Sequence, residues 1–358
     1  MPLVANSELP SFERLRHEGE TIISSNQAVH QDIRELHIGL LNMMPDKALE
    51  ATERQFFRLI GESNQIAQFY MHPFTIQDLP RSREGREHVA RYYKSFEQIK
   101  EEGLDALIIT GAQPGPELSA LPFWEPLIGI IDWAYENVTS TLCSCLATHA
   151  VMEFRYGQKR RLLPTGKRWG VYSHRVMDKI HPLVTGMDTR FDIPHSRFYQ
   201  IDRSQFEQAG LKVLVESDEA GVHLAVSPDG FRIVLFQGHP EYDVISLMKE
   251  YKREIGCYIN GELTGYPPLP ENYFTLRNRA ILDEFQDRVD TARRQGTALP
   301  PFPEALLIPT IDNTWHDSAE AVINNWIGKV YQITHIDRRR PFREDIDPDD
   351  PLSLAVSG

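Results

Sequence analysis

Short apolar runs alternate with amphipathic segments along the first half of the chain. The runs are rich in branched and aromatic side chains and occupy residues 37–44, 66–72, 104–112 and 138–144. Segments 46–60 and 123–137 repeat apolar residues at helical spacing, and 81–102 predicts a loop followed by a surface helix. Strands that alternate with helices in this way predict a mostly parallel sheet with helices on both faces, an α/β fold of the flavodoxin-like class.

The second half is interrupted by turns and predicts shorter strands, followed by helices. Strands are expected at 169–176, 191–193, 211–216, 222–227 and 231–237, and helices at 244–255, 276–295 and 319–331. The chain is therefore expected to comprise an N-terminal arm over 1–34 with a short helix at 12–17, a main α/β domain over 35–265, a helical extension packed on it over 266–338, and a disordered acidic tail over 339–358.

Cys145 stands where a predicted strand turns directly into a helix. Ligands of parallel sheets bind beyond the carboxyl ends of the strands, so Cys145 and the loop after Gly111 are expected on one rim. The free N–H groups of a helix start lower the pKa of a thiol and can hold an oxyanion, which favours a nucleophile. The alternative is a small buried hydrophobe, as most lone cysteines are, because the glycines of a G-x-S-x-G turn are absent.

His239 and Glu241 follow a second buried strand. A cysteine nucleophile needs a base, and one residue of spacing lets Glu241 orient one imidazole nitrogen while the other faces the thiol. A turn histidine capped by a carboxylate is the commoner explanation of such a pair alone, but its combination with Cys145 favours catalysis. The pair differs from H-E-x-x-H and lacks a third ligand, so we expect no metal. Cys143, one pleat deeper in its strand, and Cys257 are interpreted as structural.

Composition narrows the class of protein further. The 358 residues carry a formal charge of −13, which disfavours nucleic acid and anionic membranes as partners. Three cysteines without a disulfide framework fit a reducing cytoplasm. The first residues lack a basic region followed by an apolar core, and no run approaches a membrane span. We therefore expect a soluble cytoplasmic protein.

Several strings in the chain resemble one family. They are LNMMPDK at 41–47, LIITGA at 107–112, TSTL at 139–142, GVY at 170–172, PHSR at 194–197, GHPEYD at 238–243, NW at 325–326 and VYQIT at 330–334. In this order they resemble the cysteine-dependent homoserine O-acyltransferases of methionine biosynthesis, which are similar in fold to class I glutamine amidotransferases. The resemblance covers residues 35–336.

The resemblance implies a ping-pong acyl transfer without a cofactor other than the acyl-CoA co-substrate. Cys145 matches the family's nucleophile, and His239, supported by Glu241, would activate the hydroxyl of L-homoserine. The positions that match the family's amino-acid-binding residues are Lys167, Ser196 and Arg253. Without the match, each of these three side chains would be read as solvated. Relatives also suggest a homodimer.

The acyl donor is succinyl-CoA or acetyl-CoA in this family. Glutamate at one loop position accompanies acetyl transfer, whereas glycine accompanies succinyl transfer, and Gly115 matches that position. A carboxylate there would fill space and repel the second carboxylate of a succinyl group. We therefore expect succinyl-CoA, with Lys47 as a partner for its distal carboxylate. Glu117, two residues on, could reach the same space and favour acetyl-CoA.

Two further hypotheses use the same sequence features. A glutaminase of the amidotransferase class would employ the same three side chains, although its cysteine usually has flanking glycines where this chain has Ser144 and Leu146. A catalytically silent binding protein could retain the fold. Release of CoA that requires homoserine, hydrolysis of glutamine, or neither reaction separates the three hypotheses.

Overall fold

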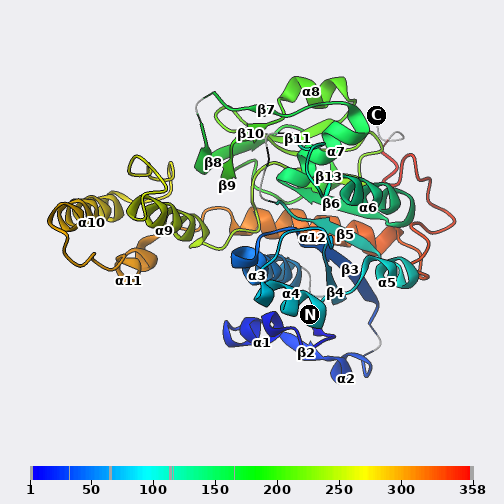
Figure 1. Ribbon diagram of the computed structural model, residues 1–358. Helices are drawn as coiled ribbons and strands as arrows, with labels where there is room; N and C mark the ends of the chain where they lie inside the picture. The colour runs from blue at the N-terminus through cyan, green and yellow to red at the C-terminus, as the bar shows by residue number, and fades with distance from the viewer. Residues whose placement is uncertain are drawn as a thin grey trace.

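One large sheet organises the protein, as the computed structural model shows (Figure 1). The structure describes residues 3–31, 33–63, 67–112, 115, 117–164 and 166–354. Its parallel half consists, in spatial order, of β2 (Ile22–Ser24), β1 (Leu3–Ala5), β4 (Gln68–Phe74), β3 (Glu35–Leu41), β5 (Ala106–Ile109), β6 (Ser140–Ser144) and β13 (Ile233–Phe236). The antiparallel half continues with β12 (Gly221–Val226), β11 (Lys212–Ser217), β8 (Arg168–Val176) and β9 (Arg190–Arg197).

Helices cover both faces of this sheet. One face is covered by α1 (Pro10–His17), α3 (Asp46–Ser63) and α12 (His316–Ile333), and its apolar core continues into α9 (Ser246–Ile259) and α10 (Leu276–Gln295). Those of the other face come from α5 (Phe96–Glu102), α6 (Trp124–Asn137), α7 (Leu146–Tyr156) and α8 (Arg203–Gln208). The shorter elements are α2 (Ser25–Ala28), α4 (Arg83–Tyr92), α11 (Glu304–Leu307), the 3₁₀ turns at Pro182–Val184 and Ile308–Thr310, and the ribbon of β7 (Arg161–Leu162) with β10 (Tyr199–Gln200).

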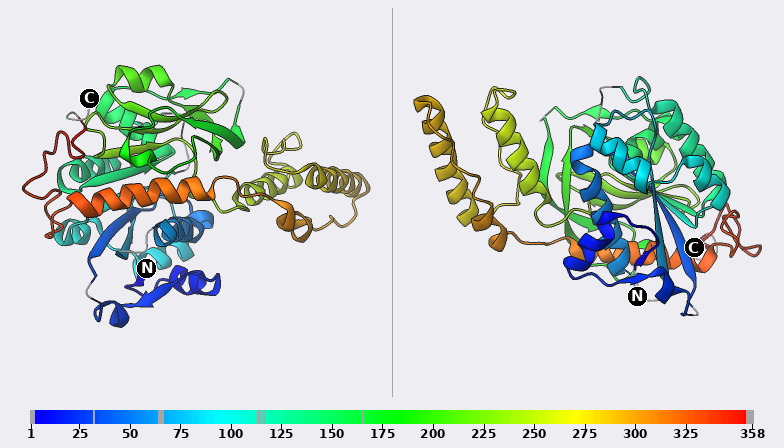
Figure 2. Two further views of the ribbon diagram at one scale, coloured as in Figure 1. Left: turned by 180° about the vertical axis from the view of Figure 1, so that it is seen from behind. Right: turned by 60° about the horizontal axis from the view of Figure 1, so that its bottom comes forward.

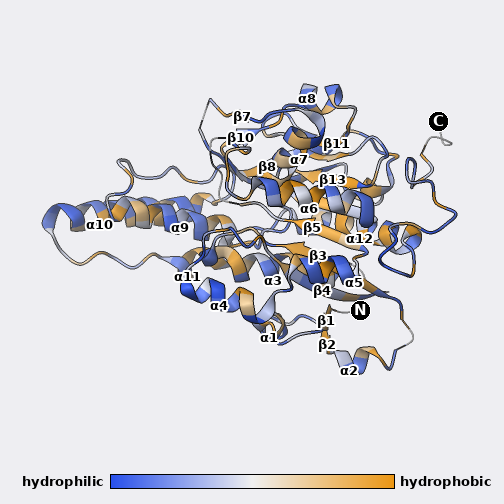
Figure 3. Ribbon diagram, turned by 45° about the vertical axis from the view of Figure 1, so that its right-hand side comes forward, coloured by the Kyte–Doolittle hydropathy of each residue, from blue (hydrophilic) through white to orange (hydrophobic). Residues whose placement is uncertain are grey.

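Two apolar cores lie on opposite faces of the central strands, which are the most hydrophobic part of the ribbon in Figure 3. Successive residues alternate between the cores because side chains of a strand point to opposite faces. In β6, Leu142 packs in one core and Cys143 in the other, and both are fully buried. The α/β fold with helices on both faces is therefore confirmed, as is the interpretation of Cys143 as a core residue.

The helix α12 lies across the sheet and reaches the strand that precedes Cys145 (Figure 1). Trp326 is fully buried, and its Nε1–H donates to Oγ of Ser140 at 2.8 Å. Thr139 Oγ1 donates to Oγ1 of Thr334 at 2.8 Å. The C-terminal part of the chain thus holds the base of β6 in place.

The helices α10 and α11 project from the main body together with α9 (Figure 2). Packing between α9 and α10 joins Tyr251 and Ile255 to Leu282 and Phe285 in one apolar cluster. In the described ranges, no helix combines the length and apolarity that crossing a membrane requires.

Three segments differ from the expected organisation. The arm over 1–34 contributes β1 and β2 to the sheet edge, where Leu3 pairs with Ile22 and Phe69. Segment 81–102 forms two helices, each begun by a serine cap. The tail is not disordered over 339–354, because Phe342 is buried and Arg343 N–H donates to the carbonyl of Ile333 at 3.1 Å. The other domain boundaries stay a prediction.

Several buried histidines make the fold sensitive to acid. Burial, together with the charge of Lys212, lowers the pKa of His181 to about 4. Burial also lowers the pKa of His174 to about 4 and that of His149 to about 3. The unfolded chain binds these protons near pH 6.5, so the free energy of unfolding is expected to fall as the pH drops from 6.5 toward 4. Each of these histidines is expected to lower the free energy of unfolding by about 2 kcal/mol when the pH falls to 5.

The variant His181→Asn tests this expectation. Nδ1 of His181 accepts the N–H of Leu183 at 3.2 Å, a cap that asparagine can replace without titrating. The free energy of unfolding is measured with urea at pH 7 and at pH 5. Its decrease between these pH values should be about 2 kcal/mol smaller in this variant than in the wild type. Substituting the exposed His30 by asparagine serves as the control. An unchanged pH dependence in His181→Asn would contradict the assignment.

Candidate active site

Cys145 occupies the sharp turn between β6 and α7. Its backbone has φ 52° and ψ −107°, a conformation that non-glycine residues rarely adopt. The turn is fixed because Cys145 N–H donates to the carbonyl of Phe236 at 2.8 Å and Thr148 Oγ1 donates to the carbonyl of Cys143 at 2.9 Å. This places the thiol at the carboxyl edge of the sheet, beside the unpaired N–H groups that begin α7.

The second strand end brings His239 to the same edge. Strands β13 and β6 are parallel, with Phe236 opposite Ser144, so the turn after β13 lies next to Cys145. The N–H of His239 donates to the carbonyl of Pro194 at 2.8 Å, which fixes the turn. Nδ1 of His239 lies 2.8 Å from Oε1 of Glu241, and both residues are buried. The expected rim position is thus found for the three proposed catalytic side chains.

Charge on the neighbours stabilises the protonated imidazole of His239. Burial alone lowers the pKa of His239, but the Glu241 carboxylate and the Cys145 sulfur, through charge and hydrogen bonds, together raise it to about 10. A histidine beside a cysteine is the pair that activates a thiol as a nucleophile. The arrangement can therefore attack a carbonyl and can return a proton to a leaving group.

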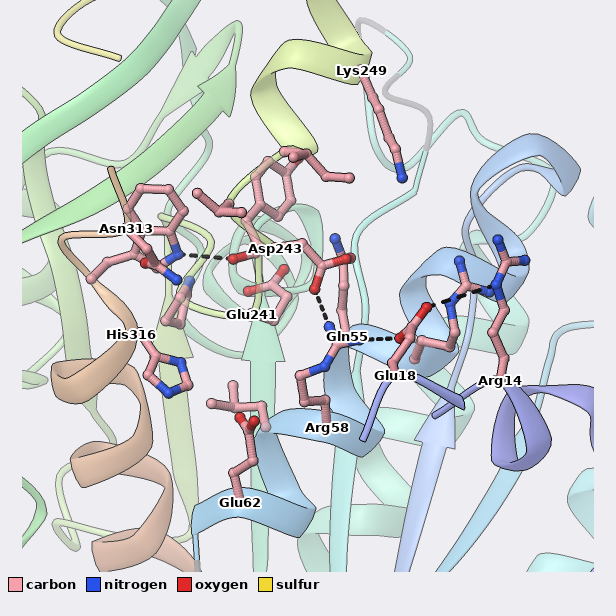
Figure 4. A pocket seen from close by; sticks show the side chains of 17 residues that line it. Arg14, Glu18, Gln55, Arg58, Glu62, Glu241, Asp243, Lys249, Asn313 and His316 are labelled. Carbon is pink, nitrogen blue, oxygen red and sulfur yellow. Dashed lines mark hydrogen bonds and ion pairs between the residues drawn. The ribbon is translucent and has the colours of Figure 1, made fainter. Parts of the chain in front are cut away.

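Glu241 also lines a pocket of about 410 Å³, which is drawn in Figure 4. Arg58 projects into this pocket from α3 and pairs with Asp243, with Glu18 and, at 3.2 Å, with Glu20. Oε2 of Glu241 is buried and has no hydrogen-bond partner among the described residues. The ion pairs of Arg58 tie the N-terminal segment to the catalytic turn.

Lys167 and Ser196 converge on a carboxylate that the sequence analysis missed. Oε2 of Glu250 accepts from Ser196 Oγ at 2.7 Å and from Lys167 Nζ at 3.1 Å. Oε1 accepts from the hydroxyl of Tyr242 at 2.7 Å, and the ring of Tyr242 stacks on His239 with centroids 4.4 Å apart. Burial raises the pKa of Glu250, but these donors lower it below its usual value overall, so the carboxylate stays ionised.

Arg253 lies one helical turn after Glu250 on α9. It is exposed and contacts Glu254 at 3.5 Å, so it does not join the cluster around Glu250. The spacing of three residues between Glu250 and Arg253 places both on one side of the helix.

The loop after β5 adjoins the nucleophile. A Cβ atom built on Gly111 would lie 3.6 Å from Cβ of Cys145 and 3.9 Å from Sδ of Met44. Gly115 lies further along this loop, where a Cβ atom would come within 2.6 Å of Cδ2 of Leu121. Lys47 is exposed in the first turn of α3. Among the described residues, no group of three or more histidine, cysteine or acidic side chains is arranged to hold a metal ion.

Comparisons with known proteins identify relatives over nearly the full length. The family described as homoserine O-succinyltransferase matches residues 2–336. A homoserine O-succinyltransferase of Nitrosococcus oceani is 68% identical over 355 residues, and one of Allochromatium vinosum is 65% identical over 356 residues; each alignment covers 99% of both chains. Among solved structures, a glutamine amidotransferase from Thermotoga maritima aligns at 11% identity with a TM-score of 0.43, over 84% of this chain and 99% of the other.

Proposed function

The chain belongs to the homoserine O-succinyltransferase family, and on this premise we propose that it transfers a succinyl group from succinyl-CoA to the hydroxyl of L-homoserine. The position of Cys145 beside the His239–Glu241 pair supports this proposal most directly, because a covalent acyl transfer needs a nucleophile and a base in contact. The reaction is the committed step of methionine biosynthesis in this family and uses no cofactor beyond its co-substrate.

In the first half-reaction, the thiolate of Cys145 attacks the thioester carbonyl of succinyl-CoA. The N–H groups at the start of α7 hold the oxyanion that forms. The bond from the carbonyl carbon to the CoA sulfur then breaks. CoA leaves with the proton of His239, and the succinyl group stays on Cys145 as a thioester.

In the second half-reaction, neutral His239 takes the proton of the homoserine hydroxyl. The oxygen attacks the thioester on Cys145, the carbon–sulfur bond breaks, and the product ester leaves. His239 keeps the proton, so the thiolate and imidazolium are restored. Glu241 orients the ring through both steps by its contact with Nδ1 at 2.8 Å.

The cluster around Glu250 is proposed to bind the amino acid. An ionised carboxylate suits the α-ammonium group of homoserine, and the exposed guanidinium of Arg253 on the next turn suits its α-carboxylate. Lys167 and Ser196 hold the Glu250 carboxylate in position. Tyr242 links this cluster to the catalytic histidine, since it bonds Glu250 and stacks on His239.

Release of free CoA thiol tests the proposed reaction. The protein is mixed with succinyl-CoA, with and without homoserine, and the thiol is followed with a chromogenic reagent. Sustained release that requires homoserine supports the transferase. Ammonia from glutamine, without CoA release, would support the glutaminase hypothesis instead, and the absence of both reactions would support a silent binding protein.

Gly115→Glu is expected to move the donor preference from succinyl-CoA toward acetyl-CoA. A side chain at this position presses on Leu121 and adds a negative charge beside the acyl group. The ratio of kcat/KM for the two donors, measured with one homoserine preparation, should change by at least about tenfold. Gly115→Gln, which adds a side chain of the same size without the charge, serves as the matched control. An unchanged ratio in Gly115→Glu, or a wild type that prefers acetyl-CoA, contradicts the assignment of the loop.

A homodimer in the cytoplasm is proposed as the working form. The projecting helices carry exposed apolar side chains, among them Leu276 at 85% and Leu306 at 60% exposed. The cysteines of the chain are free, which fits a reducing compartment. Light scattering of the purified protein measures its mass in solution, and a monomeric mass at working concentrations would exclude the dimer.

A further inference from the structure

Arg160 contacts the loop after β5 at Gly115. Its Nη2 donates to the carbonyl of Gly115, and its guanidinium lies over the ring of Tyr199, 3.9 Å from the centroid. The side chain is half-buried, and its buried Nε has no hydrogen-bond partner among the described residues. A guanidinium carries five N–H donors, and the part of the chain that the structure describes accepts from one of its nitrogens, Nη2.

No carboxylate among the described residues forms an ion pair with Arg160, in contrast with its neighbour. Arg161 pairs with Asp202 through two hydrogen bonds, one of them at 2.7 Å. The described contacts of Arg160 are a backbone carbonyl and an aromatic ring, neither of which neutralises its charge. Partial burial has already removed water from around this cation, so its charge interacts more strongly with an anion that comes from outside the chain.

Arg160 also lies within electrostatic range of the nucleophile. Burial lowers the pKa of Arg160, while negative charge on Tyr199, Cys145 and Glu153 acts in the opposite direction. The charge of Arg160 also contributes to the lowered pKa of His149, which stands one turn after Cys145 on α7. The guanidinium thus contacts the backbone at Gly115 and lies within range of the charge on Cys145.

We propose that Arg160 binds the distal carboxylate of the succinyl group and so determines the choice of donor. This inference rests on the proposed function. The carboxylate stands two methylene groups beyond the thioester carbonyl that reacts with Cys145, whereas an acetyl group has no counterpart. A guanidinium presents parallel N–H donors that match the two oxygens of a carboxylate.

This assignment places the carboxylate on Arg160 rather than on Lys47. Lys47 is exposed, and its ammonium group remains solvated. Arg160 is partly withdrawn from water and is held in place by Gly115 and Tyr199, so its charge discriminates more strongly between donors.

Arg160→Gln provides the test, because glutamine removes the charge and keeps an N–H donor for the carbonyl of Gly115. We expect kcat/KM for succinyl-CoA to fall by about 30- to 100-fold and that for acetyl-CoA to stay within about threefold. Arg160→Lys retains the charge but not the paired N–H donors of the guanidinium. Its kcat/KM for succinyl-CoA should therefore fall less, by about tenfold. Retained turnover of acetyl-CoA shows in the same samples that the variants fold.

The matched control is Arg155→Gln, which removes the same charge from the far end of α7, where Arg155 pairs with Asp132. In Arg155→Gln, kcat/KM for both donors should stay within about twofold of the wild-type values. Equal losses on both donors in Arg160→Gln and Arg160→Lys would assign Arg160 a structural role and overturn the inference, as would no loss. A wild type that does not use succinyl-CoA refutes the proposed function instead, so the two failures are distinguishable.

Discussion

Replacing Cys145 by serine is expected to abolish acyl transfer, with a fall in kcat of at least about 10⁴-fold. A serine hydroxyl is a much weaker nucleophile than a cysteine sulfur, so the nucleophile is lost while the turn keeps its shape. Steady-state CoA release measures the effect. Intact-mass measurement after incubation with succinyl-CoA should show the succinyl adduct on the wild type and none on the variant.

Cys143→Ser is the matched control for this experiment. Cys143 lies two residues earlier in the same strand but is fully buried, and burial raises the pKa of its thiol far above the usual range. Most of the activity should therefore remain, with some loss of stability because a hydroxyl enters an apolar core. An adduct that persists in Cys145→Ser would remove Cys145 from the mechanism.

Replacing His239 by alanine is expected to block turnover as severely, by about 10⁴-fold or more. The imidazole supplies the proton for CoA and accepts the proton of homoserine, so both half-reactions lose their acid or base. Glu241→Ala should be milder, at about 10²- to 10³-fold, because the base remains but loses its orientation and its charge partner.

Single-turnover measurements separate these roles. Acylation is followed by mass with succinyl-CoA alone, and deacylation begins when homoserine is added. Both steps should slow in His239→Ala. Asp243→Asn, two residues after Glu241 in the same turn but paired with Arg58, controls for loss of charge nearby. Activity within a few-fold of wild type in Glu241→Ala would exclude this carboxylate from catalysis.

Local sequence patterns predicted the centre of the fold and the ends of its strands. Strand β5 is a run of four apolar residues and α6 follows the spacing of its apolar residues, so both elements can be recognised in the local sequence. Because β6 and β13 are neighbours and parallel, residues at their carboxyl ends meet. From the sequence, Cys145 and His239 could be placed on one rim because each follows a buried strand, whereas the adjacency of the two strands is a finding of the structure.

Other features depend on partners far away in the chain. Strands β1 and β2 have three residues each, and only their pairing with each other and with β4 makes them strands. Glu250 stands on an ordinary amphipathic helix, and its role appears only when Ser196 from β9 reaches it. Arg160 follows the end of α7 in a short basic run, where its hydrogen bond to Gly115 had no local signal.

The contact between α12 and β6 can form only late in the synthesis of the chain. Trp326 bonds Ser140 across 186 residues. At about 5–20 residues per second, a ribosome adds this intervening chain in roughly 10–40 s. Throughout this interval the nascent protein already contains Cys145 but lacks the helix that supports the start of its strand. The active site is therefore expected to form only near the end of synthesis. Chains truncated before residue 316 are expected to be inactive.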